Sequence, residues 1–322
     1  MSDNIHGFGD TEPSDNNNNN NDNDNQYSYD DPTPILLKRR YTGDPREQSI
    51  PNYLKETLYP FFRFKSFSFI IIVVNVAIYI ISLCPHGLND YNKDLYFLPP
   101  HYQTLRDFGD LYGYKIRCKP IQAYRWIAGN LLHASFEHIL YNCFAILIIG
   151  TMLEYLIGIW RYIAIYCLSG LLGSLFSALI EPDVASVGAS ICICGVIAAD
   201  IGFHIINWNI LPKIFGIPNR CCLIMFPIII AFLQIPMYVN SEGDSDISKT
   251  NINIYGHLGG LIFGFFMSFI FIKPRDESDT CFLPYKTFFI LGIVVCSAFA
   301  LIGFPCFYLL NKYKSDAVCK KN

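Results

Sequence analysis

Long apolar stretches alternate with short polar or charged segments along most of this chain. Seven of the stretches are close to the roughly 20 residues that an α-helix needs to cross a lipid bilayer. They lie at about residues 67–83, 126–153, 162–180, 190–207, 222–239, 254–272 and 287–310. The pattern therefore predicts an all-α polytopic membrane protein with seven spans.

Charged residues between the stretches indicate how the spans are oriented. The basic cluster Lys38, Arg39 and Arg40 precedes the first span, which favours a cytosolic N-terminus. With seven spans, this orientation also puts the basic positions Lys213 and Arg275 on the cytosolic side. The spans at 190–207 and 254–272 then both begin near the opposite, non-cytosolic face.

The chain divides into three parts by composition. Residues 1–65 are predicted to form a disordered polar and acidic cytosolic tail and juxtamembrane segment, because a stretch so rich in Asn and Asp buries too little apolar surface to fold. Residues 66–273 are predicted to form the membrane core. Residues 274–322 are predicted to hold a linker, the seventh span and a short tail.

Overall composition agrees with a membrane protein and excludes other classes. Hydrophobic residues make up 52% of the chain and charged residues 16%, whereas soluble domains are about 25% charged. A net charge of −3 without a basic patch argues against a nucleic-acid partner. None of the cysteines forms a zinc-type pair, so no metal or cofactor is predicted. Cys84 and Cys118 flank a predicted non-cytosolic loop and are candidates for a disulfide.

Ser190 opens the fourth span and is the strongest candidate for chemistry. Gly188 lets the backbone turn sharply just before it, and the free N–H groups of a helix N-terminus favour an anion. His257, near the start of the sixth span, is a candidate general base for a serine nucleophile. The alternative is that Gly and Ser serve here as ordinary packing residues of membrane helices.

Polar residues of the second span form a second candidate group. His138 and Asn142 are four residues apart, share a helix face and can both donate hydrogen bonds to an oxyanion. Their alternative role is hydrogen bonding between helices. Asp200 and His204 form another pair, but Asp200 lies ten residues after Ser190, roughly 15 Å along the helix, and is too deep to orient His257. We interpret that pair as structural.

Taken together, these motifs resemble those of the rhomboid intramembrane serine proteases. The matching positions are His133, His138 and Asn142; Gly150, Glu154, Gly158 and Arg161; Gly188 and Ser190; and His257, Gly260 and Gly264. Gly256, Gly260 and Gly264 also recur every four residues, a spacing that lets helices approach closely. The resemblance covers about residues 66–310. A span after the histidine is similar to the secretory-pathway branch, with six core helices plus one C-terminal helix.

The resemblance implies a role for each motif residue. Ser190 would be the nucleophile and His257 the general base, while His138 and Asn142 would help the Ser190 N–H to bind the oxyanion. Gly188 and His133 would support the site. The implied structural residues are Glu154, Arg161, Gly260, Gly264 and Arg125. The chain departs from the family pattern at Tyr124, Ile191 and Cys194, of which the last two bear on the shape of the pocket.

The implied activity is cleavage of single-span transmembrane proteins within the lipid bilayer of a secretory-pathway membrane. One alternative is an inactive rhomboid-like protein that binds membrane clients, and the retained serine and histidine distinguish this chain from such relatives. The other is a polytopic transporter that uses the buried polar residues. Transporters usually show internal repeats, which this sequence lacks.

Overall fold

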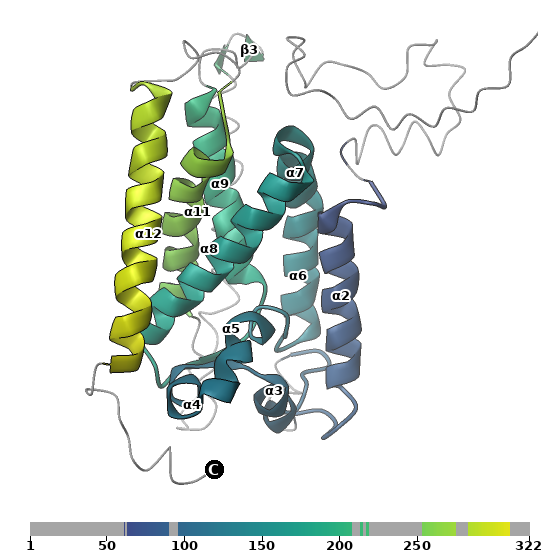
Figure 1. Ribbon diagram of the computed structural model, residues 1–322. Helices are drawn as coiled ribbons and strands as arrows, with labels where there is room; N and C mark the ends of the chain where they lie inside the picture. Colours follow the sequence, from purple (N-terminus) through teal and green to yellow (C-terminus); the bar gives the residue numbers. More distant parts are fainter. Residues whose placement is uncertain are drawn as a thin grey trace, which may run out of the picture. The chain divides into compact units, whose positions relative to one another are not determined.

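Six of the seven predicted spans are helical in the computed structural model, which describes residues 61, 63–89, 96–207, 213–214, 217–218, 253–274 and 283–309. The helices are α2 (Phe67–Ser82), α6 to α7 (Phe136–Ile157), α8 (Ile159–Ile180), α9 (Ser190–Ile206), α11 (Ile254–Phe271) and α12 (Tyr285–Leu309) (Figure 1). All except α2 and α9, which are shorter apolar helices, are long and apolar enough to cross a membrane. The predicted all-α polytopic fold is confirmed. The predicted span at 222–239 and nearly all of the predicted tail lie outside the described residues.

The second predicted span begins ten residues too early. Instead of one helix from residue 126, the structure has a short helix α5 (Arg125–Ala128), a connection, and then α6 (Phe136–Ala145). The Ser135 hydroxyl accepts the N–H of His138 at 3.2 Å, a helix N-cap that fixes the start of α6. A π-helical turn, η3 (Ile146–Gly150), joins α6 to α7 (Thr151–Ile157). His133, predicted within the span, therefore lies in the connection before it.

Helix α11 packs closely against α8 and α9, and small residues make this possible. A β-carbon added to Gly264 would overlap the backbone of Gly195, and one added to Gly260 would overlap the carbonyl oxygen of Ile191. The backbones of α9 and α11 therefore touch along the glycine face of α11.

Replacing Gly264 with alanine is expected to push α9 and α11 apart. Overpacking of this kind typically costs about 1–3 kcal/mol of stability. We expect a lower yield and a lower melting temperature in detergent, measured by fluorescence-detected size exclusion after heating. Gly303→Ala is the matched control, because a β-carbon at this buried glycine of α12 would meet side-chain carbons no closer than 3.1 Å. Equal stability of the two variants would contradict close α9–α11 contact.

The segment between α2 and α6 is folded rather than a plain loop. It contains α3 (Tyr102–Phe108), β1 (Leu111–Tyr112), α4 (Gly113–Cys118), η2 (Pro120–Tyr124) and α5, which we call the connecting subdomain. It lies at the end of the bundle where α9 and α11 begin (Figure 1). Strand β1 pairs antiparallel with β2 (Ala185–Ser186), just before α9. Two further strands among the described residues, β3 (Lys213–Ile214) and β4 (Ile217–Pro218), pair with each other.

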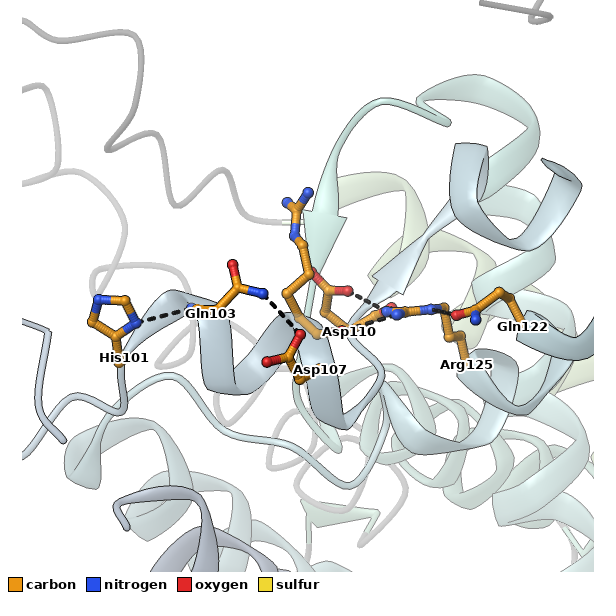
Figure 2. Close-up of polar contacts among 7 residues, drawn as sticks. His101, Gln103, Asp107, Asp110, Gln122 and Arg125 are labelled. Atoms are coloured by element: carbon orange, nitrogen blue, oxygen red, sulfur yellow. Dashed lines mark hydrogen bonds and ion pairs between the residues drawn. The ribbon is translucent and has the colours of Figure 1, made fainter. Parts of the chain in front are cut away.

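Arg125 holds the connecting subdomain together (Figure 2). Its guanidinium donates to the carboxylate of Asp110 at 2.5 Å and to the backbone oxygen of the same residue at 2.9 Å. It also donates to the side chain of Gln122 at 2.6 Å and to the backbone oxygen of Arg106 at 2.8 Å. Because the side chain is buried, these bonds replace its lost hydration. The structural role that the resemblance implies for Arg125 stays a prediction, and these bonds are the contacts through which it would act.

Glu154 links α7 to the start of α2 at the other end of the bundle. Its carboxylate accepts the N–H of Phe67 at 2.8 Å, and the N–H and hydroxyl of Ser68 at 2.8 and 2.7 Å. Nearby, Arg161 in the first turn of α8 donates to the carbonyl oxygen of Ile157 at 3.2 Å. Gly158 connects α7 to α8 with a φ of +86°, a backbone conformation that favours glycine.

Replacing Glu154 with glutamine is expected to destabilise the fold without changing the chemistry. The amide keeps one acceptor oxygen but turns its NH₂ group toward donors, so charge-assisted bonds worth about 1.5–3 kcal/mol each are weakened. The melting temperature should fall while kcat of the folded fraction stays unchanged. Glu181→Gln, at the opposite end of α8, is the matched control. A fully stable Glu154 variant with no activity would contradict the structural role.

The proposed Cys84–Cys118 disulfide is wrong. Cys84 is free, whereas Cys118 is disulfide-bonded. The two cysteines end different elements: Cys84 follows α2, whereas α4 lies next to the end of α12, where Arg117 contacts the ring of Phe307 at 5.4 Å. The other cysteines that the structure describes are free, so the partner of Cys118 lies outside the described residues.

Candidate active site

Ser190 and His257 form a hydrogen-bonded pair between two membrane helices. The Oγ atom of Ser190, the first residue of α9, lies 2.6 Å from Nε2 of His257 in the first turn of α11. Ser190 is almost fully buried. The two helices start at the same end of the bundle and touch at Gly260 and Ile191, which places the two side chains at the same depth.

The backbone before Ser190 is held in a sharp turn. Gly188 has a φ of +131°, which favours glycine, and its N–H donates to the carbonyl oxygen of Gly129 at 2.9 Å. This bond anchors the turn to the end of α5. The connecting subdomain therefore sets the position of the nucleophile candidate from outside the bundle.

His138 lies directly over this turn. A β-carbon on Gly188 would be 2.6 Å from Cε1 and 2.7 Å from Nε2 of His138, and 3.4 Å from Oγ of Ser190. Glycine is thus required here, and the imidazole edge and the serine hydroxyl border the same small space. The N–H of Ala134 points to Nδ1 of His138 over a long 3.5 Å, which leaves Nε2 to carry the proton.

Asn142 lies one helical turn further along the same face of α6, and its side chain is buried. Neither Nδ2 of Asn142 nor Nε2 of His138 has a hydrogen-bond partner among the residues that the structure describes. A buried donor without a partner is costly unless water or a substrate atom meets it, so both groups are candidates for hydrogen bonding to an oxyanion. Both donors lie on the face of α6 that carries His138 to the Ser190 turn.

His133 is fully buried beside His138, with ring centroids 5.2 Å apart. Burial holds the pKa of the His133 imidazole well below its usual value, and the neighbouring His138 lowers it further. His133 is therefore neutral at neutral pH. It supports the ring of His138 from the connection before α6.

The three departures from the family pattern have different consequences. Ile191 packs against Gly173 of α8 and joins the cluster around Leu111 and Trp126. The β-carbon of Cys194 would lie 3.2 Å from one added to Gly260, one turn after His257, so its small size permits the close contact of the helices. The ring of Tyr124 accepts a cation–π contact from Arg125 at 5.5 Å.

Asp200 and His204 are buried further along α9 and interact with each other. Nδ1 of His204 lies 2.6 Å from the backbone oxygen of Asp200 and 3.7 Å from its carboxylate. The structural role of the pair stays a prediction.

Asn253 contributes to the site but was missed at the level of sequence. It caps α11 and hydrogen-bonds to Ser177 of α8 and Ser186 of β2. Asparagine directly before an apolar helix is a recognisable cap signal. Its long-range bonds depend on the tertiary fold.

Comparison with known proteins shows which family the chain belongs to. Residues 120–274 match the family model of the Rhomboid domain. RHOMBOID-like protein 6, mitochondrial, of Arabidopsis thaliana is 30% identical over 263 residues, which cover 70% of this chain and 80% of that protein. The chain belongs to the rhomboid family. Rhomboid-like protease 1 of Toxoplasma gondii is 26% identical over 273 residues, which cover 84% of this chain and 85% of that protein.

Membership of the rhomboid family confirms the resemblance seen in the sequence motifs. The matched region begins at η2 and ends just after α11, so it includes every residue of the candidate active site. RHOMBOID-like protein 7 of Arabidopsis thaliana is 26% identical over 262 residues, which cover 73% of this chain and 79% of that protein.

Proposed function

We propose that this rhomboid is an active intramembrane serine protease. The observation that carries the proposal is the 2.6 Å contact between Oγ of Ser190 and Nε2 of His257, buried at the junction of two membrane helices. The pair has the geometry of a nucleophile and its base. Inactive relatives and transporters have no need of this arrangement.

The reaction is acyl transfer to water. His257 accepts the hydroxyl proton as Oγ of Ser190 attacks the carbonyl carbon of a peptide bond, forming a tetrahedral intermediate. The carbon–nitrogen bond then breaks, and His257 returns the proton to the leaving amine. Water, deprotonated by His257, attacks the acyl-enzyme ester and releases the new carboxylate together with the free Ser190 hydroxyl.

The negative oxygen of the intermediate needs preorganised donors. Nε2 of His138 and Nδ2 of Asn142 supply two, and the backbone N–H of Ser190 at the start of α9 supplies a third. The helix N-terminus adds a favourable dipole for the same charge.

The proposed substrates are single-span membrane proteins. A membrane helix hides its carbonyl groups in hydrogen bonds, so the substrate must unwind locally before Ser190 can attack. We place the site at the non-cytosolic face of a secretory-pathway membrane, with a cytosolic N-terminus. The basic cluster Lys38, Arg39 and Arg40 before the first span supports this orientation.

Co-expression with a panel of single-span proteins tests the proposal. Cleavage products should form with the wild type and vanish with Ser190→Ala at equal expression. A client-binding protein without protease activity would instead co-purify with panel members and release no fragments from either variant.

A further inference from the structure

Asn253 joins three separate parts of the molecule through its backbone and side chain. Its Oδ1 accepts the hydroxyl of Ser177 at 2.5 Å and the N–H of Gly256 at 2.6 Å. Its Nδ2 donates to the hydroxyl oxygen of Ser186 at 2.8 Å, and its backbone oxygen accepts the N–H of His257 at 3.0 Å. The residue is almost fully buried.

The side-chain amide has one orientation that satisfies its neighbours. The N–H of Gly256 can only donate, so the atom facing it must be the carbonyl oxygen of Asn253. The NH₂ group then faces the hydroxyl of Ser186, which can accept. The hydrogen-bond partners of the Asn253 amide therefore determine which of its two end atoms is the oxygen and which is the nitrogen.

The bond to Ser186 connects the two halves of the proposed catalytic pair. Ser186 lies in β2, four residues before Ser190, and pairs with Leu111 of the connecting subdomain. Asn253 lies four residues before His257 and caps its helix. The bond between their side chains thus runs directly between the segment that carries the nucleophile and the helix that carries the base.

We propose that Asn253 is a positioning residue, which sets the distance between Ser190 and His257 through its hydrogen bond to Ser186. The proposal rests on the proposed protease function. Asn253 bonds to the turns beside the pair rather than to Ser190 Oγ or His257 Nε2, so it acts through these turns. Misplacement of reacting groups by an ångström can cost a factor of about a hundred in rate.

Ser186→Ala tests the bond with the least damage, because it leaves the α11 cap and the Ser177 bond in place. We expect kcat to fall about tenfold, within the hundredfold range for misplaced groups, with KM unchanged and a small fall in melting temperature because Nδ2 of Asn253 loses its acceptor. Ser186→Thr keeps a hydroxyl and should retain wild-type kcat. Ser268→Ala, on the far part of α11 where the hydroxyl bonds to its own helix, is the matched control.

A double-mutant cycle separates positioning from general stability. Asn253→Ala should lower both kcat and melting temperature, because it also removes the cap. In that background, Ser186→Ala should have no further effect on kcat, since the bond is already absent. Wild-type kcat in Ser186→Ala, or an equal loss in both backgrounds, would overturn the proposal. Absence of Ser190-dependent cleavage by the wild type would instead contradict the protease function itself.

Discussion

Replacing Ser190 or His257 with alanine is expected to reduce cleavage of a transmembrane substrate to background. The nucleophile and the base act as a unit, and in a soluble serine protease the loss of either costs on the order of a million-fold in kcat. The same dependence should hold here, because Nε2 of His257 lies 2.6 Å from Oγ of Ser190. Purified variants in proteoliposomes with a fluorogenic single-span substrate give the measurement.

The double variant provides the internal control. Because each single change already disables the unit, Ser190→Ala with His257→Ala should be no worse than either change alone. Expression and membrane insertion should be normal for all three, since neither residue is an apolar anchor. Turnover by Ser190→Ala above that of empty membranes would show that another residue is the nucleophile.

Removing His138 and Asn142 together is expected to have the second-largest effect. Charge develops on the carbonyl oxygen only during attack, so donors placed for that oxygen act on kcat and leave KM almost unchanged. Losing one such donor typically costs about a hundred- to a thousand-fold. Here each single alanine variant should lose roughly ten- to a hundred-fold, since other donors remain, and the double variant much more.

The competing role for these residues is hydrogen bonding between helices. In that case Asn142→Ala would lose about 0.6 kcal/mol of stability, the average for such membrane bonds, with kcat unchanged. Measuring kcat and thermal unfolding on the same purified variants separates the two roles. A lowered melting temperature at full turnover would contradict the oxyanion role.

The length and hydropathy of the apolar stretches predicted most of the helices, because a helix that crosses a bilayer must be long and apolar. Helix α9 starts at Ser190 as predicted, and α11 begins at Ile254. The start of α6 was misplaced because residues 126–134 are apolar enough to continue a span. The hydroxyl of Ser135 overrides that pattern by capping the helix at Phe136.

The connecting subdomain could not be predicted from the hydropathy pattern. Its short elements depend on the buried Arg125 network and on pairing of Leu111 with Ser186, contacts between residues far apart in the sequence. The same limit explains why Asn253 was missed while its neighbour His257 was found. Motif spacing marks residues that carry chemistry, whereas positioning bonds become visible in the folded chain.

Labelling with a fluorophosphonate is the most direct test of the central claim, that Ser190 is a nucleophile activated by His257. Membranes containing the wild type should yield one modified peptide, with the probe on Ser190, as read by mass spectrometry. Labelling should be lost in Ser190→Ala and strongly slowed in His257→Ala. A probe on a different serine, or no labelling in a preparation that cleaves substrate, would contradict the account.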